Sequence, residues 1–321
     1  MLLFTTACRH SKVIQLADTD VQGACNPKNI RTIDDSAFSI IHATKTAPHP
    51  ELSKYYSATS LQVAGLIGAT DLLNSYFNLL QRYRQDSSVD TRLGILEYRQ
   101  QIVYRISVAS LEVGSVSSEL DCELERAHQV ADYLLAKKGN REKNLTVGAI
   151  VVTAAGAVLT GILKDNSEFA ADRIGIVSGL VGAGLGVLAL TGDKKVEFKH
   201  PENALADIWH QPAVSKMFPL PIWQFLCMPH GDTAKQKTLR SRLIADWQKM
   251  GQLPPNSQME ELQEAANLYF GKGGIYNANQ LNNRANMLDQ LTAAINLLTQ
   301  DLRLLLRETE AMGELLRARK Q

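Results

Sequence analysis

Two apolar segments without charged residues, 145–163 and 174–190, lie near the middle of this chain of 321 residues. They hold 19 and 17 residues, close to the roughly 20 that a helix needs to cross the hydrocarbon core of a bilayer. Only a short polar connector, Lys164–Arg173, separates them. The pair predicts a helical hairpin that enters a membrane, within a protein that is otherwise charged and helical.

The two arms of this hairpin contain no aromatic residue and are rich in glycine. Several glycines are spaced four residues apart, and this pattern allows helix backbones to approach closely in lipid. In water each glycine would cost roughly 1 kcal/mol against alanine, which favours membrane insertion over a hairpin buried in a soluble core. A hairpin that inserts only after a trigger is a third interpretation. The predicted packing residues are Gly148, Gly156, Gly161, Gly175, Gly179, Gly182 and Gly186.

Composition excludes some classes of function. The 34 basic and 33 acidic residues nearly cancel, so no general attraction to nucleic acid is expected. Aromatic residues make up only 6% of the chain, too few to favour a surface on which single-stranded bases stack. The four cysteines, Cys8, Cys25, Cys122 and Cys227, form no CxxC motif. No zinc knuckle or thioredoxin-like site is indicated, and the cysteines allow no pairing to be chosen.

The first eight residues, Met-Leu-Leu-Phe-Thr-Thr-Ala-Cys8, run from apolar through small residues to a cysteine. This resembles the end of a bacterial lipoprotein signal, and the resemblance implies that Cys8 carries a lipid. The segment departs from that pattern in two ways, since it has no basic start and Thr5 replaces the usual leucine. The alternative is an ordinary apolar N-terminus with a free Cys8, and an earlier start codon could supply the rest of a signal.

The charges around the hairpin give a conflicting orientation. Four basic residues precede the first arm within ten positions, and Lys194 and Lys195 follow the second. The connector holds one more acidic than basic residue. By the positive-inside rule both outer flanks would face the cytoplasm, whereas a lipidated Cys8 would place them outside the inner membrane. An outer membrane as the target, or an unmodified Cys8, would remove the conflict.

The fold class predicted for the chain is all-α, a bundle of long helices with coiled-coil-like seams. No proline occurs between Glu51 and His200, and interior proline breaks helices. One helix is expected over 51–85, and a second from Asp90 to about Lys138, ending at Gly139-Asn140. The Pro-rich region 196–234 is expected to be irregular except for a short helix near 204–210. Further helices are expected near 233–250 and 256–270. The predicted regions are a signal-like start and leader (1–50), a long-helix pair (51–144), the hairpin (145–191), a Pro/Trp-rich region (192–234) and C-terminal helices (235–321).

Two long segments repeat apolar residues at intervals of three and four, which is typical of helix seams packed against other helices. We interpret both seams as core. The first comprises Ile102, Ile106, Ala109, Val113, Val116, Leu120, Leu124, Ala127, Ala131 and Leu134, and the second Leu288, Leu291, Ile295, Leu298, Leu302, Leu305, Thr309, Met312 and Leu316. Trp209 and Trp223 follow the hairpin and either mark a membrane interface or fill the end of the bundle.

No catalytic or metal site emerges from the sequence. Two ExxH motifs, ending at His128 and His200, have the spacing of di-iron ligands in helical bundles. The second lies outside any convincing helix, and Asp132 explains His128 as a surface pair. Acidic neighbours would raise the pKa of Cys122 and lower its reactivity. The glycines form no phosphate-binding loop. We expect neither enzymatic activity nor a cofactor.

Three functions therefore remain open. The first is a membrane-anchored structural or interaction component of a bacterial cell envelope, in the cell membrane or outer membrane, that binds itself or a protein partner through its helical seams. The second is a secreted pore-forming protein, because the order of long helices around an apolar hairpin resembles the layout of the cytolysin A and haemolysin BL group. That resemblance implies that 145–190 inserts on contact with a membrane. The third is a soluble helical scaffold.

Overall fold

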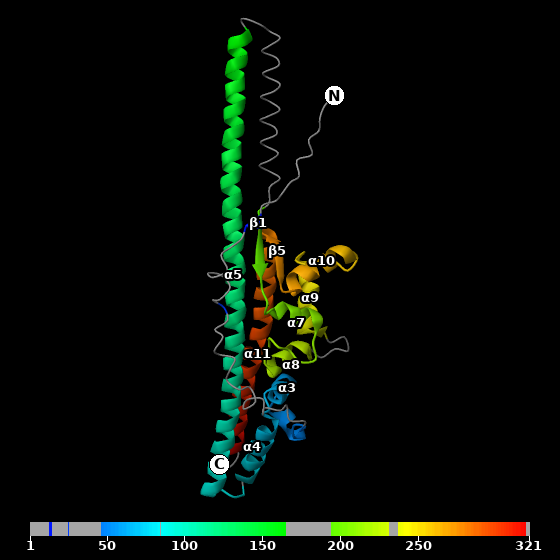
Figure 1. Cartoon of the computed structure of the whole chain (residues 1–321). Coiled ribbons are helices and arrows are strands. Elements are labelled where there is room, and N and C mark those ends of the chain that lie inside the picture. The colour runs from blue at the N-terminus through cyan, green and yellow to red at the C-terminus, as the bar shows by residue number, and fades with distance from the viewer. Residues whose placement is uncertain are drawn as a thin grey trace. The chain divides into compact units, whose positions relative to one another are not determined.

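The computed structural model of the chain describes residues 13–14, 25, 46–83, 85–164, 194–230 and 237–318, with side chains in the longest helix described as far as Lys137. The fold is a bundle of helices with two small sheets (Figure 1). The helices are η1 (Pro50–Lys54), α3 (Ala58–Leu66), α4 (Thr70–Tyr83), α5 (Val89–Lys164), α7 (Ala204–His210), α8 (Leu220–Cys227), α9 (Leu239–Lys249), α10 (Met259–Phe270) and α11 (Ala278–Ala318). The strands are β1 (Val13–Ile14), β2 (Lys195–Lys199), β3 (Pro229–His230), β4 (Lys237–Thr238) and β5 (Gly273–Asn277).

The chain divides into two compact units. We call the first the sheet unit; it comprises Met1–Val21, Glu125–Lys199 and Gly273–Ala285. We call the second the bundle unit; it comprises Gln22–Leu124, His200–Lys272 and Asn286–Gln321. Both long helices, α5 and α11, contribute residues to each unit.

In the bundle unit, α5 and α11 lie side by side and antiparallel. Ser117 donates to Asn296 at 2.9 Å and Arg99 donates to Glu310 at 3.3 Å. Residue numbers therefore increase along α5 in the direction in which they decrease along α11. Both predicted seams are confirmed as core: in the first every residue is buried except Leu124, which is half-buried, and in the second every residue is buried. The residues spaced by three and four thus form the face that each of α5 and α11 buries in the bundle.

The helix predicted over 51–85 is wrong as a single element, because local capping divides it. The hydroxyl of Ser57 accepts from the amide of Ser60 and begins α3. Gly68 then adopts a φ of +64°, the left-handed conformation that glycine tolerates best, and α4 begins two residues later. Tyr56 donates to Thr309 of α11 at 3.1 Å, which fastens the start of this segment to the bundle.

The helix break predicted at Gly139-Asn140 is also wrong, since α5 runs without interruption from Val89 to Lys164. A single glycine costs only about 1 kcal/mol inside a helix, and a helix of this length can absorb that cost. The first apolar arm, 145–163, is therefore helical, as expected, but it continues the bundle helix instead of following a turn.

The region after the hairpin is more regular than expected. The short helix predicted near 204–210 is confirmed as α7, and α8 and the strands β2 and β3 are additional elements. The helices predicted near 233–250 and 256–270 correspond to α9 and α10, each shorter at its start. Trp223 and Trp247 are buried in the core of the bundle unit. Of the two interpretations of Trp223, a membrane-interface residue or a residue that fills the bundle, its burial supports the second.

Candidate functional site

The predicted membrane elements lie largely beyond the described side chains. Gly148, Gly156 and Gly161 fall in the helical continuation of α5. The second arm, with Gly175, Gly179, Gly182 and Gly186, and the lipidation candidate Cys8 fall outside the described residues. Among the residues whose side chains the structure describes, no helix is both long and apolar enough to span a membrane. The structure does describe the elements from which both membrane candidates extend.

The sheet unit contains a three-stranded sheet in the order β1-β2-β5 (Figure 1). Strand β1 pairs parallel to β2, with Val13 opposite Lys195 and Ile14 opposite Val196. Because parallel strands run in the same direction, the first residues of β1 and β2, Val13 and Lys195, lie at the same end of the sheet. Cys8 stands five positions before Val13, and the end of the second arm, Leu190, stands five positions before Lys195.

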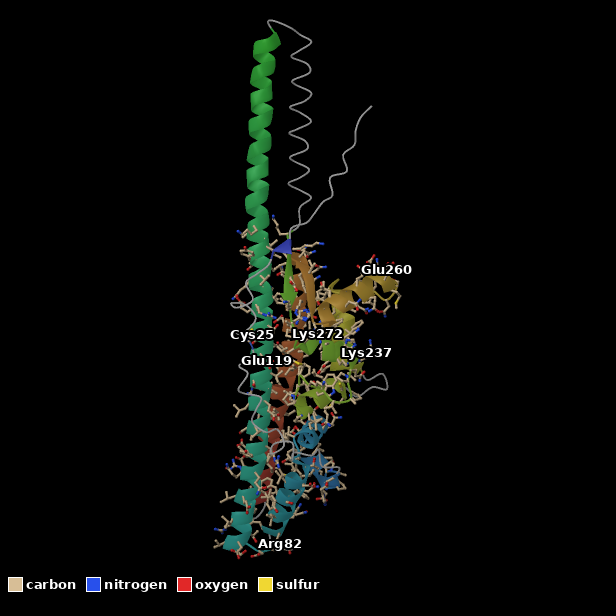
Figure 2. All side chains as sticks on the ribbon, in the orientation of Figure 1. Cys25, Arg82, Glu119, Lys237, Glu260 and Lys272 are labelled. Carbon is tan, nitrogen blue, oxygen red and sulfur yellow. A yellow bond between two sulfur atoms is a disulfide. The ribbon has the colours of Figure 1, made fainter. Side chains whose placement is uncertain are left out.

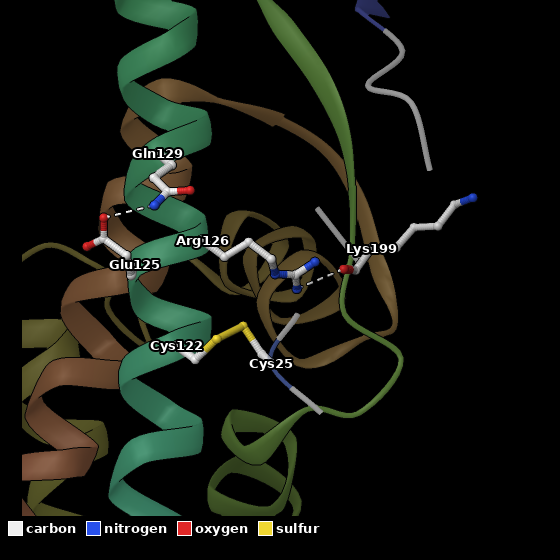
Figure 3. Close-up of a disulfide and its surroundings, with 6 residues drawn as sticks. All are labelled: Cys25, Cys122, Glu125, Arg126, Gln129 and Lys199. Carbon is white, nitrogen blue, oxygen red and sulfur yellow. Dashed lines mark hydrogen bonds between the residues drawn. A yellow bond between two sulfur atoms is a disulfide. The ribbon is translucent and has the colours of Figure 1, made fainter. Parts of the chain in front are cut away.

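An arginine joins the long helix to the strand that follows the hairpin. Arg126 of α5 is almost fully buried and donates to the backbone carbonyl of Lys199 at 3.1 Å (Figure 3). Its guanidinium also lies 4.3 Å from the ring centre of Phe198, a cation–π distance. We call Arg126, Phe198 and Lys199 the root clamp, because α5 leads into the apolar segment and β2 leads out of it. Within the sheet unit, the root clamp thus joins α5, which leads into the apolar segment, to β2, which follows it.

Strand β5 pairs with β2 on the side opposite β1 and lies next to the root clamp. The two strands pair antiparallel from Lys195–Asn277 to Lys199–Gly273. Phe198 meets Tyr276 edge to face, with ring centres 5.8 Å apart. Gly273 has a φ of +124°, and a Cβ there would approach the backbone of Phe198 and Lys199, 2.7 Å from the Cα of Lys199. Only glycine fits this point of close approach.

The exposed face of β2 is basic on balance. Burial alternates along the strand, so Val196 and Phe198 face the core while Lys195, Glu197 and Lys199 face solvent. The Lys199–Glu197 pair, at 3.8 Å, is half-exposed and contributes little to stability. Lys194 adds a further positive charge next to Lys195. The exposed residues of this segment thus carry a small excess of positive charge.

In the bundle unit, a disulfide joins Cys25 to Cys122 on α5 (Figure 3). The two Cα atoms are 5.4 Å apart, within the usual range for a disulfide. Cys25 lies beside α5 (Figure 2), so the N-terminal leader is fastened to the bundle. The expectation that acidic neighbours tune a Cys122 thiol is wrong, because Cys122 carries no thiol.

The two ExxH motifs are not brought into a shared site with other carboxylates. The ring Nδ1 of His128 lies 3.1 Å from Asn282 of α11, so Asn282, and not the expected Asp132, holds this ring. His200 follows β2, is buried, and its backbone amide donates to Lys272. Among the described residues no group of three or more metal-ligating side chains is found.

Comparison with models of protein families, with curated proteins and with solved structures found no match to this chain. The central features of the described structure are the root clamp, the parallel pairing of β1 with β2 and the disulfide.

Proposed function

We propose that this protein is a membrane-anchored, non-enzymatic helical component of a bacterial cell envelope. In this proposal two anchors act together, the apolar hairpin 145–190 and a lipid on Cys8. The folded helices then stand on the membrane and present their surfaces to partners. The lipid bilayer is the first partner, and neither nucleic acid nor a cofactor is required.

The observation that carries the proposal is the parallel pairing of β1 and β2. Five positions of chain extend to about 17 Å at most, so Cys8 and Leu190 must each lie within that reach of paired residues, Val13 and Lys195. Neighbouring strands are about 4.8 Å apart. A lipid on Cys8 and an inserted hairpin would therefore enter the same patch of bilayer. One acyl signal alone gives only marginal membrane binding, and stable anchoring takes two.

The disulfide supports a location outside the cytoplasm. Disulfides persist in oxidising compartments such as the periplasm and are rare in the cytosol. The Cys25–Cys122 bond lies in a unit that includes much of α5, so the helical body would occupy the oxidising side. This favours insertion of the hairpin from that side and an outer membrane as its target, where the positive-inside rule does not apply. It also agrees with a lipidated Cys8.

Membrane fractionation with carbonate washing tests the proposal. Val151→Lys with Val181→Lys places one charge in each arm, at a cost of roughly 2.5–3.5 kcal/mol per charge at a helix centre. Gln101→Lys with Gln129→Lys adds the same charge at two exposed positions of α5 and serves as the control. We expect the wild type and the control to remain in the membrane, the Cys8→Ala and hairpin variants to be partly released, and their combination to be fully released.

Two results would count against the proposal. A wild-type protein that is soluble throughout would exclude permanent anchoring. A combined Cys8→Ala, Val151→Lys and Val181→Lys variant that stays in the membrane would show that the anchor lies elsewhere.

A second candidate function is pore formation, and the unbroken course of α5 favours it. A helix that passes from a packed seam into an apolar arm without a turn could insert as one rigid rod, with copies lining a pore. Purified protein added to dye-loaded liposomes separates the two candidates. Rapid leakage that Val151→Lys abolishes supports a pore, whereas membrane binding without leakage supports an anchor.

A further inference from the structure

A second apolar stripe runs along α5 on the side opposite its buried seam. Val89, Leu93, Leu96, Tyr104 and Leu111 are all more than half exposed, with Val89 at 77% and Leu111 at 74%. At 100° per residue these positions fall within one narrow sector, roughly 200° away from the seam of Ile102 to Leu120. We call this set, with the intervening Gln100, Ser107, Gly114 and Ser118, the outer stripe.

The outer stripe has the composition of a helix-pairing surface. Its steps of three and four residues match the spacing of contact positions between helices. The residues between its large side chains are small or uncharged, and no charged residue interrupts it from Val89 to Ser118. Large aliphatic residues that are exposed in a row mark an interaction surface more often than isolated exposed ones.

The flanking charges identify what fits this stripe. Along one border stand Asp90 and Glu97, and along the other Arg92 and Arg99, of which Arg99 pairs with Glu310 of its own chain. If a second copy of α5 packs in parallel, Arg92 of one copy lies opposite Glu97 of the other, five positions on, twice in the symmetric pair. An antiparallel arrangement would instead place like charges against one another. The border charges are therefore complementary to a second copy in one orientation.

We infer that the outer stripe is a homotypic interface through which two copies of this chain pair with their α5 helices parallel. The 30 positions from Val89 to Ser118 rise about 44 Å and, at a helix width of about 10 Å, offer on the order of 450 Å² per copy. A standard stable interface buries about 800 Å² per partner. The pairing is thus reversible in solution and strengthens when copies are held at high local concentration, as on one membrane.

Cysteine cross-linking of the full chain in mild detergent tests this inference. In a Cys8→Ser, Cys227→Ser background, Gln100→Cys lies on the stripe, while Gln101→Cys is also exposed but lies about 100° away around the helix. We expect at least fivefold more disulfide-linked dimer from Gln100→Cys. Val89→Cys, at the end of the stripe, should also link to itself, because parallel helices bring identical positions together.

Charge reversal provides a specific control. Glu97→Arg should reduce cross-linking at Gln100→Cys about tenfold, since two attractive border pairs become repulsive. Adding Arg92→Glu should restore it, which a merely structural defect would not allow. Equal cross-linking at positions 100 and 101, absence of a self-link at Val89→Cys, or failure of the double reversal would each overturn the inference. None of these results depends on whether Cys8 or the hairpin anchors the protein.

Discussion

The Cys25–Cys122 disulfide gives the most quantitative prediction. The bond spans 97 positions of sequence, and opening it restores the conformational freedom of that loop to the unfolded chain. In the chain-entropy relation, a loop of about 100 residues corresponds to about 4.7 kcal/mol at 25 °C. Single domains are stable by only about 5–15 kcal/mol. Cys122→Ser should therefore remove a large share of the free energy of unfolding.

Urea unfolding followed by circular dichroism measures this loss. With a urea m-value of about 2–3 kcal/mol/M, the midpoint should fall by roughly 1.5–2.5 M. Cys25→Ser and the double variant should lose the same amount as Cys122→Ser, because each removes the same bond. Reduction of the wild type should reproduce the shift. Cys227→Ser, which changes the free cysteine among the described residues, should leave the midpoint nearly unchanged and serves as the control.

Two results would refute the reasoning at different points. If Cys25 and Cys122 are alkylated in the unfolded protein before any reductant is added, the bond does not form. If mass spectrometry detects the bond but its reduction leaves the midpoint unchanged, the unfolded chain does not gain the freedom that the loop calculation assumes.

Three further predictions concern single residues. Gly273→Ala should lower the free energy of unfolding by about 3 kcal/mol or more, because the alanine would adopt a strained φ and its Cβ would overlap the backbone of β2. As a control, Gly251 has a φ of +74° but open space around it. Gly251→Ala should therefore cost only about 1–2 kcal/mol when both variants are unfolded in urea. Arg126→Met should cost about 2–3 kcal/mol by removing the cation–π contact with Phe198 and a charged hydrogen bond, and hydrogen exchange should show faster opening of β2. Burial raises the pKa of the Cys227 thiol, although nearby Arg240 opposes the shift. Iodoacetamide should therefore modify Cys227 more slowly at pH 8 than it modifies an exposed cysteine. A rate equal to or above that of the exposed cysteine would contradict the prediction.

The long helices could be predicted because their core positions repeat within a single element. Spacings of three and four predict the buried residues of α5 from Ile102 to Leu134, except half-buried Leu124, and those of α11 from Leu288 to Leu316. Such periodicity is local, and burial against any helical neighbour satisfies it.

Features that depend on distant parts of the chain could not be predicted in this way. Nothing near Cys25 or Cys122 indicates that they pair, since their positions differ by 97 and the pairing depends on the fold. Strand β5 contains two glycines in five residues, and its pairing with β2 outweighs that weak propensity. For β2 a signal did exist, because Lys-Val-Glu-Phe-Lys alternates polar and apolar residues with the period of a strand.

The described contacts of the leader bear on the proposed lipid anchor at Cys8. The sequence predicted a signal-like start and a leader over residues 1–50, and such a leader would not by itself hold the folded body close to a lipid on Cys8. The structure fastens this leader at β1, to the sheet unit, and at Cys25, to the bundle unit. With only the residues between Cys8 and Val13 left to extend, about 17 Å at most, a lipidated Cys8 would keep β2 and its basic residues near the headgroups. Lipid, hairpin and lysines would then bind the same patch of membrane, and losing one would weaken the others.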